Sequence, residues 1–87
     1  MRETARIEFT RRAVRDLESL PAVQRQKIAR KIDGLAANPR PHGVKKLCGA
    51  EEMYRLRSGD YRVIYSIADK KLLVLVIRVG NRKDIYD

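Results

Sequence analysis

The sequence predicts an α+β fold: a small, mainly antiparallel sheet with a helical hairpin packed on one face. A short alternating segment opens the chain, two helical stripes of apolar residues follow, and three segments with strand character come after them. The expected order of elements is therefore β-α-α-β-β-β. A chain of 87 residues has room for one modest core, so residues 1–87 are expected to form a single domain without internal repeats.

The first half of the chain predicts a strand and two helices. Residues 6–10 (RIEFT) alternate as a strand does, and Thr10 is a typical cap for a following helix. Apolar residues then recur at helical spacing in two stripes, and Pro21 separates them because proline breaks one helix and suits the start of the next. Asn38 precedes a proline, which pushes it out of the α region. Residues 10–38 should therefore form the helical hairpin.

The second half predicts a loop and three strands. Residues 38–52 (NPRPHGVKKLCGAEE) are expected to be a loop, because proline, glycine and charged residues interrupt any regular element. Residues 53–57 (MYRLR) and 61–68 (YRVIYSIA) then alternate as two strands joined by a tight turn. Residues 71–79 (KLLVLVIRV) are apolar on both faces, which is typical of a central strand.

The alternation in the first hairpin predicts its register. A two-residue loop at residues 58–59 pairs Arg57 with Asp60 and Arg55 with Arg62, and a three-residue loop with a bulge is the alternative. A slip of one residue would mix apolar and charged side chains on each face. Three arginines, Arg55, Arg57 and Arg62, therefore share one face, called the arginine face below. The opposite, apolar face is expected to carry Tyr54, Leu56, Tyr61, Val63 and Tyr65.

The charge of the chain indicates a polyanionic partner. The formal net charge is +9, and arginines outnumber lysines 13 to 7. Arginine presents a planar fork that matches phosphate, whereas lysine is a point charge. Nucleic acid is the usual partner of such a protein. The alternative for the arginine face is a solvated surface whose arginine stems cover apolar groups, but three clustered arginines favour phosphate binding.

The residue types present restrict the chemistry. The chain has one histidine, His42, and its acidic, cysteine and histidine residues lack the spacing of a magnesium or zinc site. No cofactor or metal is therefore expected. RNA cleavage remains open, because the 2′-hydroxyl is an internal nucleophile that needs chiefly alignment and charge stabilisation. DNA lacks this hydroxyl and would not react in this way.

Two further features indicate a cytoplasmic protein. The single cysteine, Cys48, has no partner for an internal disulfide, so a reducing compartment is expected. The N-terminus is charged and lacks the apolar core of a signal peptide. The longest apolar run, residues 72–77, is too short to span a bilayer, so no membrane partner is expected.

Two segments carry a resemblance to a known family. Residues 54–65 (YRLRSGDYRVIY) and 79–86 (VGNRKDIY) resemble the RelE toxins of bacterial toxin–antitoxin pairs. Residues 16–39 (DLESLPAVQRQKIARKIDGLAANP) also resemble that family's helical hairpin, so the resemblance covers nearly the whole chain. It implies a ribosome-dependent mRNA endonuclease that cuts the codon in the aminoacyl site. Attack by the 2′-hydroxyl would leave a 2′,3′-cyclic phosphate and a new 5′-hydroxyl.

The resemblance also implies site residues. It places catalytic roles on Arg57, Arg62, Arg82 and Tyr86, and a phosphate-binding role on Arg55. Well-studied members carry lysine where this chain has Arg55 and Arg57. Arginine holds its proton too tightly to be a good general base, so both are interpreted as phosphate clamps. Tyr86 is the candidate for orienting or deprotonating the nucleophile, or for stacking on a base.

Three more residues have an expected place. Counted from Arg78, strand alternation puts Arg82 on the side opposite the arginine face. Gly80 would let the chain leave the strand, so only the resemblance brings Arg82 into the site. Lys45 and Lys46 are expected to contact RNA, with plain solvated charge as the alternative.

The expected partners are the ribosome with its rRNA, mRNA, and a cognate antitoxin with an acidic, partly disordered segment. Two alternatives remain at this stage. ParE toxins share the fold but inhibit DNA gyrase without being enzymes, and a basic nucleic-acid binder without catalytic power is the third possibility.

Overall fold

The computed structural model describes residues 4–47 and 52–81. Cys48, Arg82 and Tyr86, singled out above, lie outside the described residues. The elements are β1 (Arg6–Phe9), α1 (Arg11–Glu18), α2 (Ala22–Gly34), β2 (Lys45–Lys46), β3 (Met53–Ser58), β4 (Tyr61–Ala68), the short 3₁₀ helix η1 (Asp69–Lys71) and β5 (Leu73–Asn81). No helix within the described ranges is long and apolar enough to cross a membrane.

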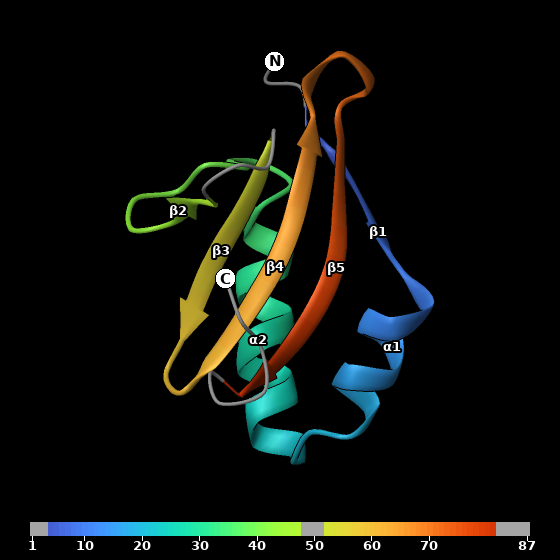
Figure 1. Cartoon of the computed structure of the whole chain (residues 1–87), viewed down its shortest axis with the longest axis vertical. Helices are drawn as coiled ribbons and strands as arrows, with labels where there is room; N and C mark the ends of the chain where they lie inside the picture. The colour runs from blue at the N-terminus through green and yellow to red at the C-terminus, as the bar shows by residue number, and fades with distance from the viewer. Residues whose placement is uncertain (1–3, 48–51, 82–87) are drawn as a thin grey trace.

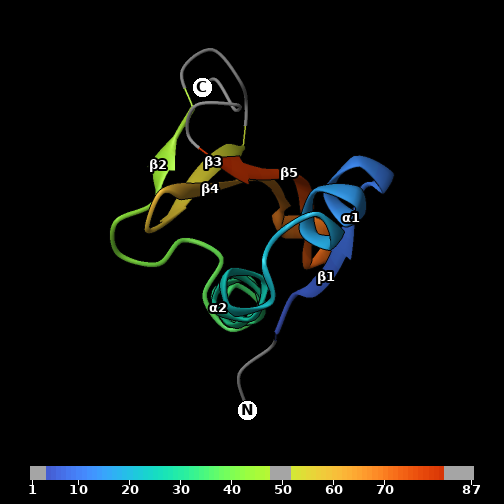
Figure 2. The ribbon, with the colours of Figure 1, turned by 90° about the horizontal axis from the view of Figure 1, so that it is seen from below.

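The strands form one five-stranded sheet in the order β1-β5-β4-β3-β2. β1 runs parallel to β5, and every other neighbouring pair is antiparallel. α2 lies across one face of the sheet, and α1 lies on the side of β1 and β5 (Figures 1 and 2). The predicted α+β fold is therefore confirmed, with a parallel pair at one edge.

Three boundaries differ from the prediction. β2 lies in the predicted loop, because two residues without strand propensity pair with β3 only through tertiary contact. α2 ends at Gly34, so the helical hairpin is shorter than residues 10–38. β5 begins at Leu73, because η1 and the left-handed Leu72 (φ 50°) precede it.

Thr10 connects the start of α1 to β5. Its side-chain oxygen accepts a hydrogen bond from the Ala13 amide at 3.1 Å, as an N-cap does. The same hydroxyl donates to the Ile77 carbonyl at 2.8 Å, and the Thr10 amide donates to the Val76 carbonyl at 2.9 Å. The predicted cap is confirmed, and it also fixes where the helix meets the sheet.

The core lies between α2 and the sheet. Ile28, Ile32 and Leu35 come from α2 and the residue that follows it, and all three are buried. They face the apolar side of β3, β4 and β5. The buried sheet residues of this core are Tyr54, Leu56, Val63, Tyr65, Ile67, Val74, Val76 and Val79. Tyr61 packs against the core as a partly buried residue, so the predicted apolar face is confirmed.

The hairpin loop lies one residue later than predicted. Ser58 pairs with Tyr61, so the loop is Gly59 and Asp60 rather than residues 58–59. Gly59 has φ +61°, the conformation that a primed hairpin turn requires at its first loop position. Arg57 therefore lies opposite Arg62. Moving the loop by one residue shifts the pairing by two, which leaves every side chain on its predicted face.

An ion cluster joins Arg40, in the segment after α2, to the start of β3 and the end of β4. The Arg40 guanidinium donates to both carboxylate oxygens of Asp69 (3.0 and 2.9 Å), to Glu52 (2.6 Å) and to the Tyr54 hydroxyl (2.9 Å). It also lies 5.3 Å from the centre of the Tyr54 ring. The hydrogen bonds from Arg40 hold the pKa of Asp69 below its usual range.

Tyr65 holds the same segment from inside the core. Its hydroxyl donates to the Pro39 carbonyl at 2.7 Å, and its ring stacks on Tyr54 with centroids 5.8 Å apart. Burial, together with the neighbouring Tyr54, raises the pKa of Tyr65 to about 12. Tyr65 is therefore a neutral hydrogen-bond donor at physiological pH.

Candidate RNA-binding and catalytic site

The arginine face forms as the sequence predicts. Arg57 lies directly opposite Arg62, and Arg55 lies opposite Ile64, so all three arginines project from the side of the sheet away from α2. β2 extends this face, because Lys45 pairs with Arg55. Residues opposite one another in an antiparallel pair point to the same side. Four cationic side chains from three strands therefore gather on one surface.

These cations surround a small cavity of about 100 Å³. It is lined by Gly43, Lys45, Arg55, Arg57 and Arg62, and is called the arginine cavity below. Sites for drug-sized ligands are several times larger, at roughly 300–1,000 Å³. The arginine cavity therefore fits one small anionic group, such as a single phosphate of a longer chain, rather than a whole nucleotide.

The strand positions give the arginine cavity a fixed geometry. The backbone ladder sets the spacing of Arg57 and Arg62, and Lys31 of α2 donates to the Arg57 carbonyl at 2.9 Å. Ser58, next along the strand, is buried. Like charges held opposite one another on a sheet repel, and an anion between them relieves that repulsion. The fold therefore sets the backbone spacing of the cations around the arginine cavity.

Lys45 and Lys46 are adjacent in the chain but lie on opposite sides of β2. Lys45 lines the arginine cavity with Arg55. Lys46 pairs with Tyr54, and its ammonium lies 3.8 Å from a Glu52 carboxylate oxygen. Lys46 therefore does not line the arginine cavity.

His42 lies outside the arginine cavity as well. It lines a separate depression with Lys31, Gly34, Pro41 and Leu56. No three His, Cys, Asp or Glu side chains among residues 4–47 and 52–81 are placed to hold a metal ion.

The end of β5 corrects the argument from strand alternation. Ile64 pairs with Arg78 while Tyr65 pairs with Val76, so Ile77 is an extra residue in a bulge. The bulge reverses the alternation. Arg78 and Gly80 consequently belong to the arginine face, with Gly80 directly opposite Arg62. The strand thus ends beside the arginine cavity, and Arg82 itself remains a prediction outside the described residues.

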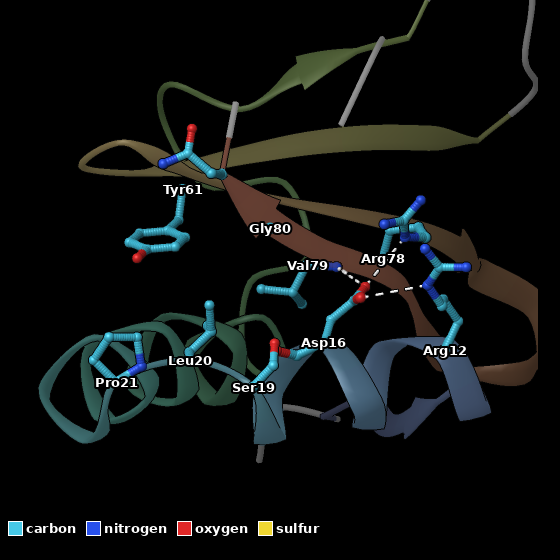
Figure 3. A pocket seen from close by; sticks show the side chains of 10 residues that line it. Arg12, Asp16, Ser19, Leu20, Pro21, Tyr61, Arg78, Val79 and Gly80 are labelled. Carbon is cyan, nitrogen blue, oxygen red and sulfur yellow. Dashed lines mark hydrogen bonds and ion pairs between the residues drawn. The ribbon is translucent and has the colours of Figure 1, made fainter. Parts of the chain in front are cut away.

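A second cavity, of about 400 Å³, lies between α1 and the end of β5. Figure 3 shows Asp16 of α1 pointing toward β5, between Arg12 and Arg78. One Asp16 oxygen accepts from the Val79 amide (2.9 Å) and from Arg78 Nε (3.1 Å), and the other lies 3.5 Å from Arg12 Nε. β1 pairs with β5 only as far as Val76. Asp16 therefore accepts the hydrogen bond of a β5 amide that lies beyond the end of β1.

The position of Asp16 was not predicted. Its sequence context, an acidic residue on a basic helix, indicates only a solvated ion pair with Arg12. Its partners on β5 are 62 and 63 residues away along the chain, and no local pattern encodes a contact at that separation.

Known proteins share both the sequence and this fold. Residues 7–86 match the family model described as "ParE toxin of type II toxin-antitoxin system, parDE". The mRNA interferase toxin RelE of Escherichia coli (strain K12) is 33% identical over 79 residues, covering 88% of this chain and 82% of that protein. The chain belongs to the RelE toxin family.

Solved structures of this family agree with that membership. The RelE–RelB complex from Pyrococcus horikoshii OT3 matches with a TM-score of 0.82 and 32% identity, covering 94% of this chain and 99% of the matched chain. The toxin–antitoxin complex RelBE2 from Mycobacterium tuberculosis matches with a TM-score of 0.77 and 29% identity, covering 92% and 99%. The resemblance predicted from residues 54–65 and 79–86 is confirmed at the level of the family.

Proposed function

We propose that this chain is the toxin of a type II toxin–antitoxin pair and cleaves mRNA in the aminoacyl site of the ribosome, in the cytoplasm. The observation that carries the proposal is the arginine cavity, where a RelE-family chain gathers four cations on one rigid sheet face. The E. coli relative named an mRNA interferase supports the same activity. The net charge of +9 suits a site made of ribosomal and messenger RNA.

The chemistry requires alignment and charge stabilisation more than a strong base. A 2′-oxygen attacks the adjacent phosphorus, and the bond to the 5′-oxygen breaks, giving the 2′,3′-cyclic phosphate. Arg57 and Arg62 lie opposite one another and stabilise the charge that grows on the phosphate oxygens. Arg55 clamps the phosphate from the neighbouring position. Arg82 and Tyr86 complete the proposed site near the leaving oxygen and the nucleophile.

An antitoxin would neutralise this surface in the cell. The solved relatives are RelE–RelB complexes, and this chain is proposed to bind a comparable partner through an acidic segment that becomes ordered on binding. Co-expression of such a partner should restore growth and give a complex that copurifies. A complex held at its rim by opposite charges should weaken as salt is raised.

Cleavage on programmed ribosomes tests the activity directly. Purified protein mixed with ribosomes that carry a defined codon should yield a cut message, located by primer extension. The description of the matched family model also names ParE, so a gyrase supercoiling assay is run in parallel. Intact message together with inhibited gyrase would reject the proposal in favour of the ParE-like alternative.

Substitution of Arg62 tests whether the arginine cavity is the catalytic site. Arg62→Ala should lower the single-turnover rate by about 10²–10³, the typical cost of losing one preorganised donor. The control is Arg6→Ala, which removes the same charge from β1, on the other side of β5, where Arg6 is exposed and paired with Glu8 at 2.8 Å. Equal rates for the two variants would reduce the arginine cavity to a binding surface.

A further inference from the structure

The four cations of the arginine cavity differ in the chemistry that they can perform. Arg55, Arg57 and Arg62 carry guanidiniums, which present planar, fixed positive charges. They stabilise charge but exchange protons poorly. Lys45 carries a primary amine, the group that lysines use when they act as general acids or bases. Among the described residues that line the arginine cavity, Lys45 is therefore the one suited to proton transfer.

The backbone brings Lys45 into this position. Lys45 is directly opposite Arg55 across the β2–β3 ladder, and Gly43 just before it also lines the arginine cavity. Lys46, the next residue, lies on the other side and is close to Glu52. The two-residue strand β2 thus directs one of two adjacent lysines into the cavity.

Among the described residues, the proton that the departing 5′-oxygen needs has no donor assigned so far. The departing 5′-oxygen is a poor leaving group as an alkoxide and must be protonated as the bond to phosphorus breaks. We propose that Lys45 is the general acid that donates this proton, a role that rests on the proposed mRNA cleavage.

The proton balance of this step closes with Lys45 and water alone. The 2′-hydroxyl releases its proton to a water molecule as its oxygen attacks phosphorus. The electron pair of the breaking bond stays on the 5′-oxygen, which takes a proton from the Lys45 ammonium. The neutral amine then regains a proton from solvent, so the products are a cyclic phosphate and a 5′-hydroxyl.

A message with sulfur in place of the bridging 5′-oxygen separates proton donation from binding. A thiol has a pKa near 8.5, so a thiolate leaves without being protonated. Lys45→Arg keeps the positive charge but holds its proton, and it should slow cleavage of the normal message by about 10²–10⁴, the usual contribution of a general acid. On the sulfur-bridged message the same variant should cut at close to the wild-type rate.

Lys46→Arg is the matched comparison, since it makes the same change one residue away on the other side of β2. Any loss of rate in Lys46→Arg should be equal on the two messages. Rates are measured at saturating protein, so that altered affinity does not contribute. Full activity of Lys45→Arg on the normal message, or an equal loss on both messages, would overturn the proton-donor role. A wild-type protein that cuts neither message would instead defeat the proposed function itself.

Discussion

Removing the Asp16 carboxylate should destabilise the protein through the end of β5. Asp16→Ala deletes the acceptor of the Val79 amide, and Val79 is only 1% exposed. A buried amide without a partner costs about 1–3 kcal/mol. The ion pair with Arg12, whose side chain is 62% exposed, adds only about 0.3–0.5 kcal/mol. The expected loss in the free energy of unfolding is therefore about 1.3–3.5 kcal/mol.

The assay is thermal and urea unfolding of the purified variants, followed by circular dichroism. In a domain of this size each kcal/mol lowers the melting temperature by about 4–8 °C, so Asp16→Ala should melt at least about 5 °C below the wild type. Asp16→Asn keeps an oxygen that can accept from the Val79 amide but loses the charge. It should therefore fall between the alanine variant and the wild type.

Glu18→Ala is the matched control for Asp16→Ala. Glu18 is an exposed acid on the same helix, so its loss changes the net charge of the protein by the same amount. A negative charge near the end of a helix is slightly unfavourable, and its removal should be neutral or mildly stabilising. Equal melting temperatures for Asp16→Ala and Glu18→Ala would refute the argument that Asp16 holds β5.

Three further substitutions test the ion cluster, the core tyrosine and the hairpin turn. The pKa of Tyr65 in the folded protein is raised to about 12. The stability that its neutral hydroxyl contributes is therefore fully present below about pH 10 and is lost as pH rises toward 12. Tyr65→Phe should remove this alkaline loss, at a cost of about 1 kcal/mol at pH 7; an unchanged alkaline profile in urea unfolding would contradict the assignment. Arg40 lowers the pKa of Asp69 in the folded protein. The stability that the Asp69 carboxylate contributes is therefore present above about pH 4 and is lost as pH falls further. Arg40→Met should flatten the decline in stability below that pH, and a decline as steep as that of the wild type would count against the ion cluster. Gly59→Ala should cost about 1–2 kcal/mol because Gly59 is left-handed at φ +61°, whereas Gly59→Asn should cost less; equal losses would point to a cause other than the backbone conformation.

The arginine face could be predicted because it depends on alternation alone. Arg55, Arg57 and Arg62 keep their side of the sheet even though the loop is Gly59 and Asp60, since that change moves the pairing by an even number of residues. The helical hairpin and the Thr10 cap were predictable for the same reason, because periodicity and capping are local signals.

Features that depend on distant partners were not predictable. The Ile77 bulge lies in a continuous apolar run without a glycine or turn signal, so nothing in that run marks the reversal of alternation. β2 is two lysines whose strand state depends on β3. The Arg40 cluster joins residues 12 to 29 positions apart, which periodicity does not report.

The placement of the arginine face supports the proposal that these cations act on a transition state as well as bind RNA. An arginine on a loop would reorganise when the charge on phosphorus grows, and that reorganisation would consume part of its stabilising effect. Here the β3–β4 ladder fixes the backbones of Arg57 and Arg62, and the same two strands carry Leu56 and Val63 into the core on the other side. Packing of the apolar side therefore holds the charged side in place before RNA arrives. In the proposed reaction, the opposed guanidiniums would stabilise the transition state more than the bound message, because the negative charge on the phosphate is greatest in the transition state.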